Sequence, residues 1–245
     1  MNLFPAYSHS FYNIKDYAFQ GVAYGTEGIL VTSWDDDGET LFGPNWFGVA
    51  IAGESAWKGG KTDLGGLKRR FSKALLGLDS SKLGDAIQLL ADTNVYSYIK
   101  YEKAGNILFN LDPFTDLDHY SKRSGGLALK EVEAKVLEIL SKDKPVKNAF
   151  LLETLPYIAH KSGVLGHKLA MTETVMKLVN EAANTNNPEL LWQAKAEIDA
   201  YIPMIDMVKE EFARLWKLEN KEFFLDVVLR RYTNQVNILQ QEARI

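Results

Sequence analysis

The sequence predicts a mostly α-helical protein that also carries a remnant of an α/β fold. Apolar residues recur at helical spacing over most of the chain. One short β-branched run, Gly28 to Ser33, stands between two helical stretches and has the composition of a strand buried on both faces. With 245 residues, of which 46% are hydrophobic, the chain is long enough to bury a real core.

Composition and charge exclude several classes of protein. The net charge of -4 comes from interspersed acids and bases, so we expect no nucleic-acid partner. The absence of cysteine excludes disulfides and thiolate catalysis without indicating a compartment. No apolar run approaches the ~20 residues that span a bilayer, and no basic stretch followed by an apolar run marks a signal peptide.

The N-terminal part reads as helix, strand, acidic loop and helix. A predicted helix over 11–24 ends at Gly25, where a left-handed cap is favoured. The strand 28–33 follows, and a second helix with a small-residue face covers 46–57. A lone parallel-type strand is not stable, because each buried unpaired backbone group costs about 1–3 kcal/mol. We therefore expect its neighbouring strands to come from another part of the protein.

The remaining chain is predicted to be helical, apart from an irregular connection over 105–126. Asn187 and Pro188 form a helix start signal, and Pro203 is expected to bend the helix that follows. Residues from about 125 onward predict an antiparallel helical bundle. The helical stretches cover 67–76, 83–101, 127–140, 149–183, 189–215 and 222–242.

The residues that follow the predicted strand are the candidates for a binding site. Trp34 stands at its C-terminal end, and Asp35 and Asp36 open the acidic loop. An indole ring covers the apolar face of a pyranose, and a carboxylate accepts hydrogen bonds from adjacent sugar hydroxyls. These three residues therefore predict a sugar-binding site, with no metal ion and no cofactor.

Other readings of the same residues remain open. A tryptophan at a strand end is often a core residue, and an Asp-Asp-Asp-Gly stretch is often a solvated turn. A calcium loop is disfavoured, because the acids are consecutive and no closing glutamate follows. Tyr7 and His9 precede the first helix and are further candidates for facing the pocket.

The stretch from Phe11 to Trp57 resembles the last strand and final helices of family 20 glycoside hydrolases. The similarity rests on Gly-Thr-Glu-Gly-Ile-Leu-Val-Thr-Ser-Trp-Asp-Asp-Asp-Gly-Glu, then Leu-Phe, Asn-Trp-Phe-Gly and a closing Ala-Trp. A weaker similarity covers 212–221, which resembles a helical stretch of bacterial members. The resemblance implies the last βα units of a (β/α)8 TIM barrel, followed by an α-helical bundle domain.

The resemblance also implies a reaction, the hydrolysis of terminal β-linked N-acetylhexosamine by substrate-assisted catalysis. Trp34 takes the position of the tryptophan that forms the floor of the sugar subsite. Asp36 falls where the family has an acid that binds sugar hydroxyls, and Asp35 could serve instead. The catalytic Asp-Glu pair of the family has no match in this sequence, so the chain alone is expected to be inactive and to carry no catalytic residue.

Three domains follow from this reading: the end of a glycosidase barrel over 1–77, a helical connection over 78–124 and an α-helical C-terminal domain over 125–245. We expect a truncated chain whose partners are an N-acetylhexosamine-containing glycan and the missing N-terminal portion of the barrel. Export of the whole protein is an implication of the resemblance, because bacterial members are often exported. Two alternatives are a non-catalytic helical interaction protein and a sugar-binding protein that kept the pocket floor.

Overall fold

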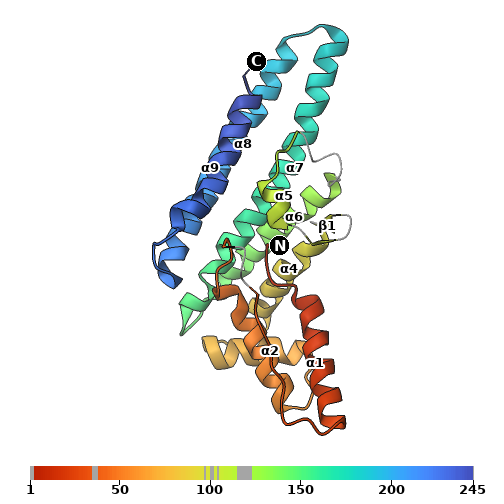
Figure 1. The fold of residues 1–245 in the computed structure, drawn as a ribbon, viewed down its shortest axis with the longest axis vertical. Helices are drawn as coiled ribbons and strands as arrows, with labels where there is room; N and C mark the ends of the chain where they lie inside the picture. The colour runs from red at the N-terminus through yellow and green to blue at the C-terminus, as the bar shows by residue number, and fades with distance from the viewer. Residues whose placement is uncertain are drawn as a thin grey trace. The chain divides into compact units, whose positions relative to one another are not determined.

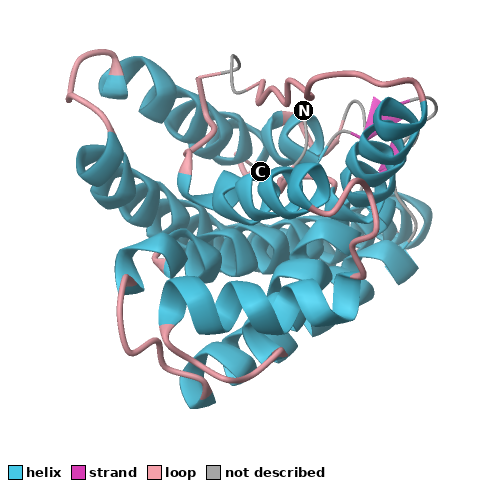
Figure 2. Cartoon of the chain, turned by 90° about the horizontal axis from the view of Figure 1, so that it is seen from below, coloured by secondary structure: helices cyan, strands magenta, loops and turns pink. Residues whose placement is uncertain are grey.

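The computed structural model describes residues 3–34, 38–96, 98–99, 102–103, 105–114 and 123–244, and these are mostly helical (Figures 1 and 2). The α-helices are α1 (Tyr7–Ala23), α2 (Trp46–Trp57), α3 (Leu64–Phe71), α4 (Lys82–Tyr96), α5 (Gly105–Asn110), α6 (Arg123–Lys142), α7 (Thr154–Thr185), α8 (Glu189–Glu219) and α9 (Leu225–Glu242). Shorter helical turns are η1 (Gly43–Asn45), η2 (Ser72–Leu76) and η4 (Ala149–Leu152). Strands β1 (Tyr98–Ile99) and β2 (Glu102–Lys103) form an antiparallel pair.

The predicted strand over 28–33 is wrong in this structure. These residues form an extended connection without ladder hydrogen bonds, and the side chain of Leu30 is 91% exposed. The reason is physical: no other strand of the described chain lies beside them, and a strand without a neighbour has no partner for its backbone groups. A barrel is therefore not seen among the described residues.

The chain divides into two compact units. The first unit comprises 1–3, 93–133 and 159–245, and the second unit comprises 4–92 and 134–158. The predicted domains are continuous ranges that end at 77 and 124, whereas each compact unit combines several segments of the chain. The predicted domain boundaries therefore stay a prediction.

Helices α1, α2 and α3 of the second unit pack around a row of aromatic rings. Neighbouring ring centroids lie 5.7 Å apart for Phe4 and Tyr7, 5.3 Å for Tyr7 and Phe47, and 5.1 Å for Phe47 and Phe71, all edge to face. This geometry suits aromatic quadrupoles. The buried row thus ties the start of α1 to the start of α2 and the end of α3.

Tyr7 is a core residue, which corrects the expectation that it faces a pocket. Its hydroxyl donates to the carbonyl of Pro44 at 2.5 Å and accepts from the backbone N–H of Gly48 at 3.1 Å. His9, by contrast, is exposed on α1.

The Tyr7 hydroxyl gives a first testable prediction. Tyr7→Phe keeps the ring packing but leaves the Pro44 carbonyl and the Gly48 amide without this partner. We expect the free energy of unfolding to fall by about 1–3 kcal/mol, measured by urea denaturation. Tyr12→Phe is the matched control, since that tyrosine is exposed on the same helix and should lose less than about 0.5 kcal/mol. Equal losses in both variants would contradict the buried role of Tyr7.

The first unit contains two antiparallel helix pairs. The helices expected for the C-terminal residues are present, and their assembly into one bundle domain over 125–245 stays a prediction. The short connection 220–224 brings α9 back along α8, and the two helices run side by side (Figure 1). The rings of Phe212 and Tyr232 lie 6.0 Å apart between them. In the other pair, Gly126 of α6 meets Gly166 of α7, and Glu133 meets Gly163, so these helices also run in opposite directions.

The predicted helices are present, but several of their ends differ from the sequence patterns by three to five residues. The predicted helix 83–101 was too long, because α4 ends at Tyr96 and β1 occupies 98–99. Gly25 adopts the expected left-handed conformation with φ of 70°, and the Asn187 side chain accepts from the Glu189 amide at 3.1 Å. Helix α8 continues through Pro203. The last helix begins at Leu225 because Phe224, with φ of 65°, is not helical. None of the described helices combines the length and the apolar composition that crossing a membrane requires.

Candidate functional site

Trp34 lies at the end of the extended connection and is open to solvent. Its side chain is 81% exposed, and the indole Nε1–H donates to the Thr32 hydroxyl at 3.1 Å. Because Thr32 belongs to the same segment as Trp34, this hydrogen bond orients the indole ring and leaves it uncovered by other elements. The reading of Trp34 as a core residue is therefore wrong for this structure, and an exposed aromatic platform remains.

The acidic loop that follows Trp34 contains Asp35, Asp36, Asp37 and Glu39. Asp35 and Asp36, the predicted hydroxyl-binding residues, lie outside the described residues. Glu39, the next acid of the loop, is buried with only 3% of its surface exposed. No periodicity in so short a loop could have indicated its burial.

Helices α1 and α2 lie side by side and run in the same direction. Their beginnings meet where the Tyr7 hydroxyl contacts Pro44 and Gly48. Their ends meet where Gly59 and Gly60, in the turn after α2, contact the last part of α1. The described residues of the connection, 24–34 and 38–42, therefore lead from the shared end to the shared beginning, and Trp34 lies along this return path.

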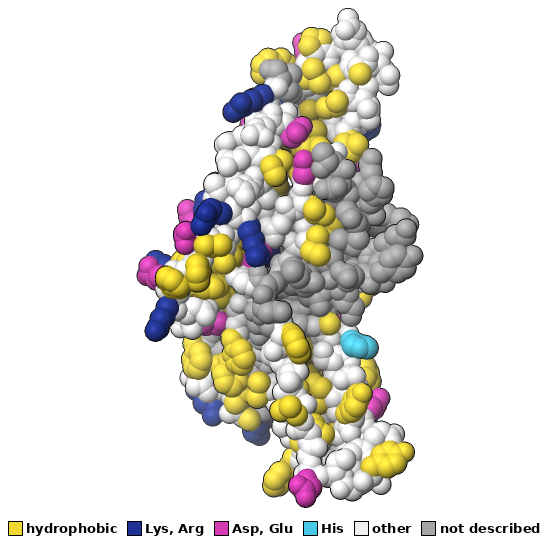
Figure 3. Space-filling model, in the orientation of Figure 1, with side chains coloured by type: hydrophobic (Ala, Val, Ile, Leu, Met, Phe, Trp, Pro, Cys, Tyr) yellow, Lys and Arg dark blue, Asp and Glu magenta, His cyan; other side chains and the backbone are white. Residues whose placement is uncertain are grey.

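Many apolar side chains are exposed on this helix pair and on the segment between its two helices. Figure 3 shows apolar side chains gathered at the surface over the region of α1 and α2. The exposed large hydrophobic residues of this part are Tyr12, Tyr17, Phe19, Val22, Tyr24, Leu30, Val31, Trp34, Phe42, Val49 and Trp57. Contiguous exposed apolar surface is uncommon on monomeric proteins and usually marks a binding face.

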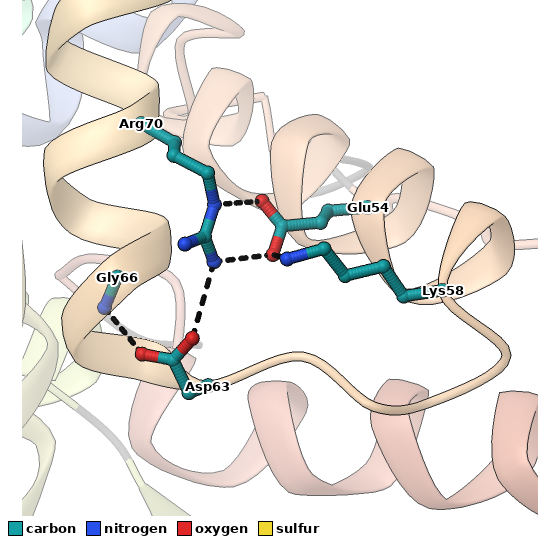
Figure 4. Close-up of polar contacts among 5 residues, drawn as sticks. All are labelled: Glu54, Lys58, Asp63, Gly66 and Arg70. Atoms are coloured by element: carbon teal, nitrogen blue, oxygen red, sulfur yellow. Dashed lines mark hydrogen bonds and ion pairs between the residues drawn. The ribbon is translucent and has the colours of Figure 1, made fainter.

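A network of charged side chains holds α2 against α3 (Figure 4). The Arg70 guanidinium donates to both carboxylate oxygens of Glu54, at 2.8 and 2.5 Å, and to Asp63 at 3.3 Å. Lys58 donates to Glu54 at 3.0 Å, and Asp63 caps α3 by accepting from the Gly66 amide at 2.5 Å. Every charge in this network has a partner, so its role is to fix the two helices.

The pKa values of the two acids reflect these contacts. Burial raises the pKa of Glu54, but the hydrogen bonds from Arg70 and Lys58 outweigh it and hold the pKa below its ordinary value. The Gly66 amide, and then Arg70, lower the pKa of Asp63. Both carboxyl groups are thus kept ionised, which is unsuitable for a general acid.

A second titratable cluster lies in the first unit, where His160 of α7 faces acids of two other helices. His160 Nδ1 lies 2.9 Å from Glu211 Oε2 of α8. The hydrogen bond to Glu211 raises the pKa of His160 against the effect of burial, and Glu133 of α6 adds to it. Burial raises the pKa of Glu133, opposed by His160 and Lys130. The long separations along the sequence left no pattern from which this cluster could have been predicted.

The His160 cluster predicts a pH dependence of stability. Because the folded-state pKa of His160 lies above the unfolded value of about 6.5, its stabilisation is complete below pH 6.5. It is lost as the pH rises through the folded pKa. We therefore expect the loss of stability in His160→Gln, relative to the wild type in urea melts at the same pH, to be largest below pH 6.5 and to shrink as the pH rises above it.

His167 is the control, because burial and Lys130 lower its pKa. Its contribution has the opposite sign: stability is gained as the pH rises toward 6.5. The loss of stability in His167→Gln, relative to the wild type, should therefore not shrink above pH 6.5. A loss in His160→Gln that does not change with pH would rule out the Glu211 pairing as its cause.

Among the described residues, histidine and acid side chains nowhere gather in a group of three or more that could hold a metal ion. Comparison with the models of known protein families found no match to this chain, and comparison with curated proteins found none either. The arguments for function therefore rest on the residues around Trp34.

Proposed function

We propose that this chain is the C-terminal part of a family 20 glycoside hydrolase of the β-N-acetylhexosaminidase type and supplies the floor of its sugar-binding site. The observation that carries the proposal is the exposed Trp34 indole at the end of an extended segment between two parallel helices. The enzyme would hydrolyse terminal N-acetylhexosamine by substrate-assisted catalysis.

The arrangement of α1, the return segment and α2 supports this proposal. Successive helices around an α/β barrel run parallel to each other and antiparallel to the strand between them. Active sites of such barrels are built at the C-terminal ends of the strands and in the loops that follow. Trp34 and the acidic loop follow residues 28–33 in the sequence, as residues of such a site would.

The exposed residues of the return segment also support it. Leu30 is 91% exposed and Val31 is exposed as well, although β-branched and aliphatic residues favour burial in a sheet. Neighbouring barrel strands would pair with the backbone of this segment and cover both side chains. We therefore propose the last βα units of a barrel for this chain only when it is assembled with the other barrel strands.

In the proposed site the residues of this chain bind substrate and do not carry the proton transfers. The Trp34 ring covers the apolar face of the N-acetylhexosamine ring, and Asp36, or Asp35, accepts hydrogen bonds from its hydroxyls. The general acid and the carboxylate that orients the acetamido group come from the remainder of the barrel. No metal ion or cofactor takes part, and the chain alone is expected to be inactive.

The proposal is tested by N-acetylglucosamine binding and by hydrolysis. In a complex with a catalytic barrel portion, hydrolysis of an aryl N-acetylglucosaminide should appear, and Trp34→Ala should raise its KM by about 10-fold or more. Trp57→Ala is the matched control, because that tryptophan is 92% exposed at the far end of α2. Unchanged kinetics in Trp34→Ala, or equal effects of both variants, would refute the assignment.

A second candidate function is a non-catalytic interaction protein, and the apolar surface around α1 and α2 favours it. A sugar-binding protein that kept the pocket floor is the related possibility. Binding of N-acetylglucosamine by the isolated chain, lost in Trp34→Ala, would favour the sugar-binding protein. A stable complex with another protein that neither binds sugar nor gains hydrolytic activity would favour the interaction protein.

A further inference from the structure

A hollow of about 440 Å³ lies between α1 and the turn that connects α2 to α3. It is lined by Lys15, Asp16 and Phe19 of α1 and by the turn 60–63. This hollow is at the end of the helix pair opposite to the contact of Tyr7 with Gly48, and it shares no residue with the Trp34 site. It therefore belongs to neither the proposed sugar site nor its loops.

The turn holds an unusual backbone because it approaches α1 closely. Gly59 and Gly60 both have positive φ, 53° and 73°. A Cβ on Gly60 would lie 2.5 Å from the Phe19 amide nitrogen and would also overlap the Lys15 carbonyl. Only glycine fits there, and its close approach fixes Lys61 and Thr62 beside α1.

Thr62 places an unpaired hydroxyl at this hollow. The residue is only 3% exposed, and among the described residues no group forms a hydrogen bond with its Oγ1 atom. A buried hydroxyl without a partner costs about 1–3 kcal/mol, so it needs an explanation. Since Thr62 lines the hollow, a ligand that supplies the missing partner is one explanation.

The charges around the hollow favour an anion. Within the described part of the chain, Lys15 and Lys61 form no ion pair, whereas Asp63 is occupied by the Gly66 amide and Arg70. Asp16 is the remaining acid, so the available side chains sum to one positive charge. Half of the Phe19 side chain is exposed and gives the hollow one apolar wall.

From these observations we propose that the hollow binds a small oxyanion of phosphate size, free or carried by a sugar, through Lys15, Lys61 and the Thr62 hydroxyl. The two ammonium groups neutralise the anion, and the hydroxyl donates to one of its oxygens. Asp16 lies where it could accept from a hydroxyl of a sugar-borne ligand.

Titration of the full chain with inorganic phosphate at constant ionic strength, followed by amide NMR shifts, tests the site. The largest shifts are expected for the amides of residues 59–63. Lys15→Gln and Lys61→Gln should each weaken binding by about 10-fold. Lys58→Gln is the matched control, because Lys58 lies in the same turn but pairs with Glu54 outside the hollow, and it should bind as the wild type does.

Thr62→Val separates a binding role from a structural one. Without phosphate this variant should unfold at a higher temperature than the wild type, since it removes an unpaired buried hydroxyl, while its phosphate affinity should fall. Glucose 6-phosphate tests the source of the anion: tighter binding than phosphate, lost in Phe19→Ala, indicates a sugar-borne anion, and equal binding indicates the free ion.

Shifts that are absent, spread over the surface, or unchanged by Lys15→Gln and Lys61→Gln would overturn the proposal. Trp34→Ala should leave phosphate binding unchanged. These experiments can therefore refute the oxyanion site without refuting the proposed sugar site, and the reverse also holds.

Discussion

Lys168→Met is expected to lower the free energy of unfolding by about 3 kcal/mol at neutral pH, because it removes a buried donor from three backbone carbonyls. Lys168 is 1% exposed, and its ammonium group donates to the carbonyls of Leu108 at 3.0 Å, Phe109 at 2.8 Å and Leu111. These carbonyls lie at the C-terminal end of α5, where a helix has no partners of its own. Methionine fills the space without replacing the hydrogen bonds.

The loss in Lys168→Met should also depend on pH with a defined sign. Burial lowers the pKa of Lys168 to about 7, and Asp112 opposes this effect. Between pH 7 and about 10.5 the unfolded chain binds more protons at this residue, so the wild type gains stability as the pH rises. The variant lacks that gain, and the difference in unfolding free energy should be larger at pH 9 than at pH 6.

Urea denaturation at both pH values measures this difference. Lys177→Met is the matched control, because Lys177 is an exposed lysine on the same helix and should change the unfolding free energy by less than about 0.5 kcal/mol at either pH. A Lys168→Met variant as stable as this control would mean that the three carbonyls do not depend on Lys168.

Helices were predictable from the sequence wherever an apolar stripe found a partner within the chain. Helix α8, predicted over 189–215, buries Ile198, Ile205, Val208 and Phe212, and the predicted helix 46–57 has the bounds of α2. In both, periodicity and packing lead to the same result. Local cap signals such as Gly25 were equally informative, because they act through their own backbone conformation.

The predicted strand shows the limit of such patterns. Residues 28–33 have the composition of a buried strand, but a strand depends on hydrogen bonds from neighbours that the described chain does not place beside it. The composition of this segment indicates a preference for a β-strand, but it cannot show whether a neighbouring strand is present to pair with it. Trp34 is exposed at the end of this segment, and its role in binding a sugar stays a prediction.

Buried polar residues were the features that sequence reasoning missed. Lys161 and Lys168 interrupt the apolar stripe of α7 in the sequence, yet both side chains are buried. The Lys161 ammonium lies 4.8 Å from the centre of the Phe109 ring, a cation–π contact with a residue far away in sequence. Their partners come from α5 and α9, and no local spacing indicates which helix will meet which lysine.

Gly166→Ala is expected to lower the free energy of unfolding by about 1–3 kcal/mol, although alanine normally stabilises a helix interior by about 1 kcal/mol relative to glycine. A Cβ on Gly166 would lie 2.5 Å from the Gly126 carbonyl oxygen of α6 and 2.9 Å from Lys130 Cγ. The reciprocal contact, from a Cβ on Gly126 to the Gly166 carbonyl, is 2.9 Å. Because the atom nearest to a Cβ on Gly166 is a backbone atom of α6, the two helices must separate to admit a methyl group.

Gly163→Ala provides the matched control on the same face of α7. The three atoms nearest to the added methyl group belong to the carboxylate end of Glu133, a flexible side chain that can move away. The gain in helix propensity then offsets the cost, and we expect a change between about zero and 1 kcal/mol of added stability. Thermal and urea denaturation of the two variants should therefore move in opposite directions; if Gly166→Ala is as stable as Gly163→Ala, close backbone contact does not hold this helix pair together.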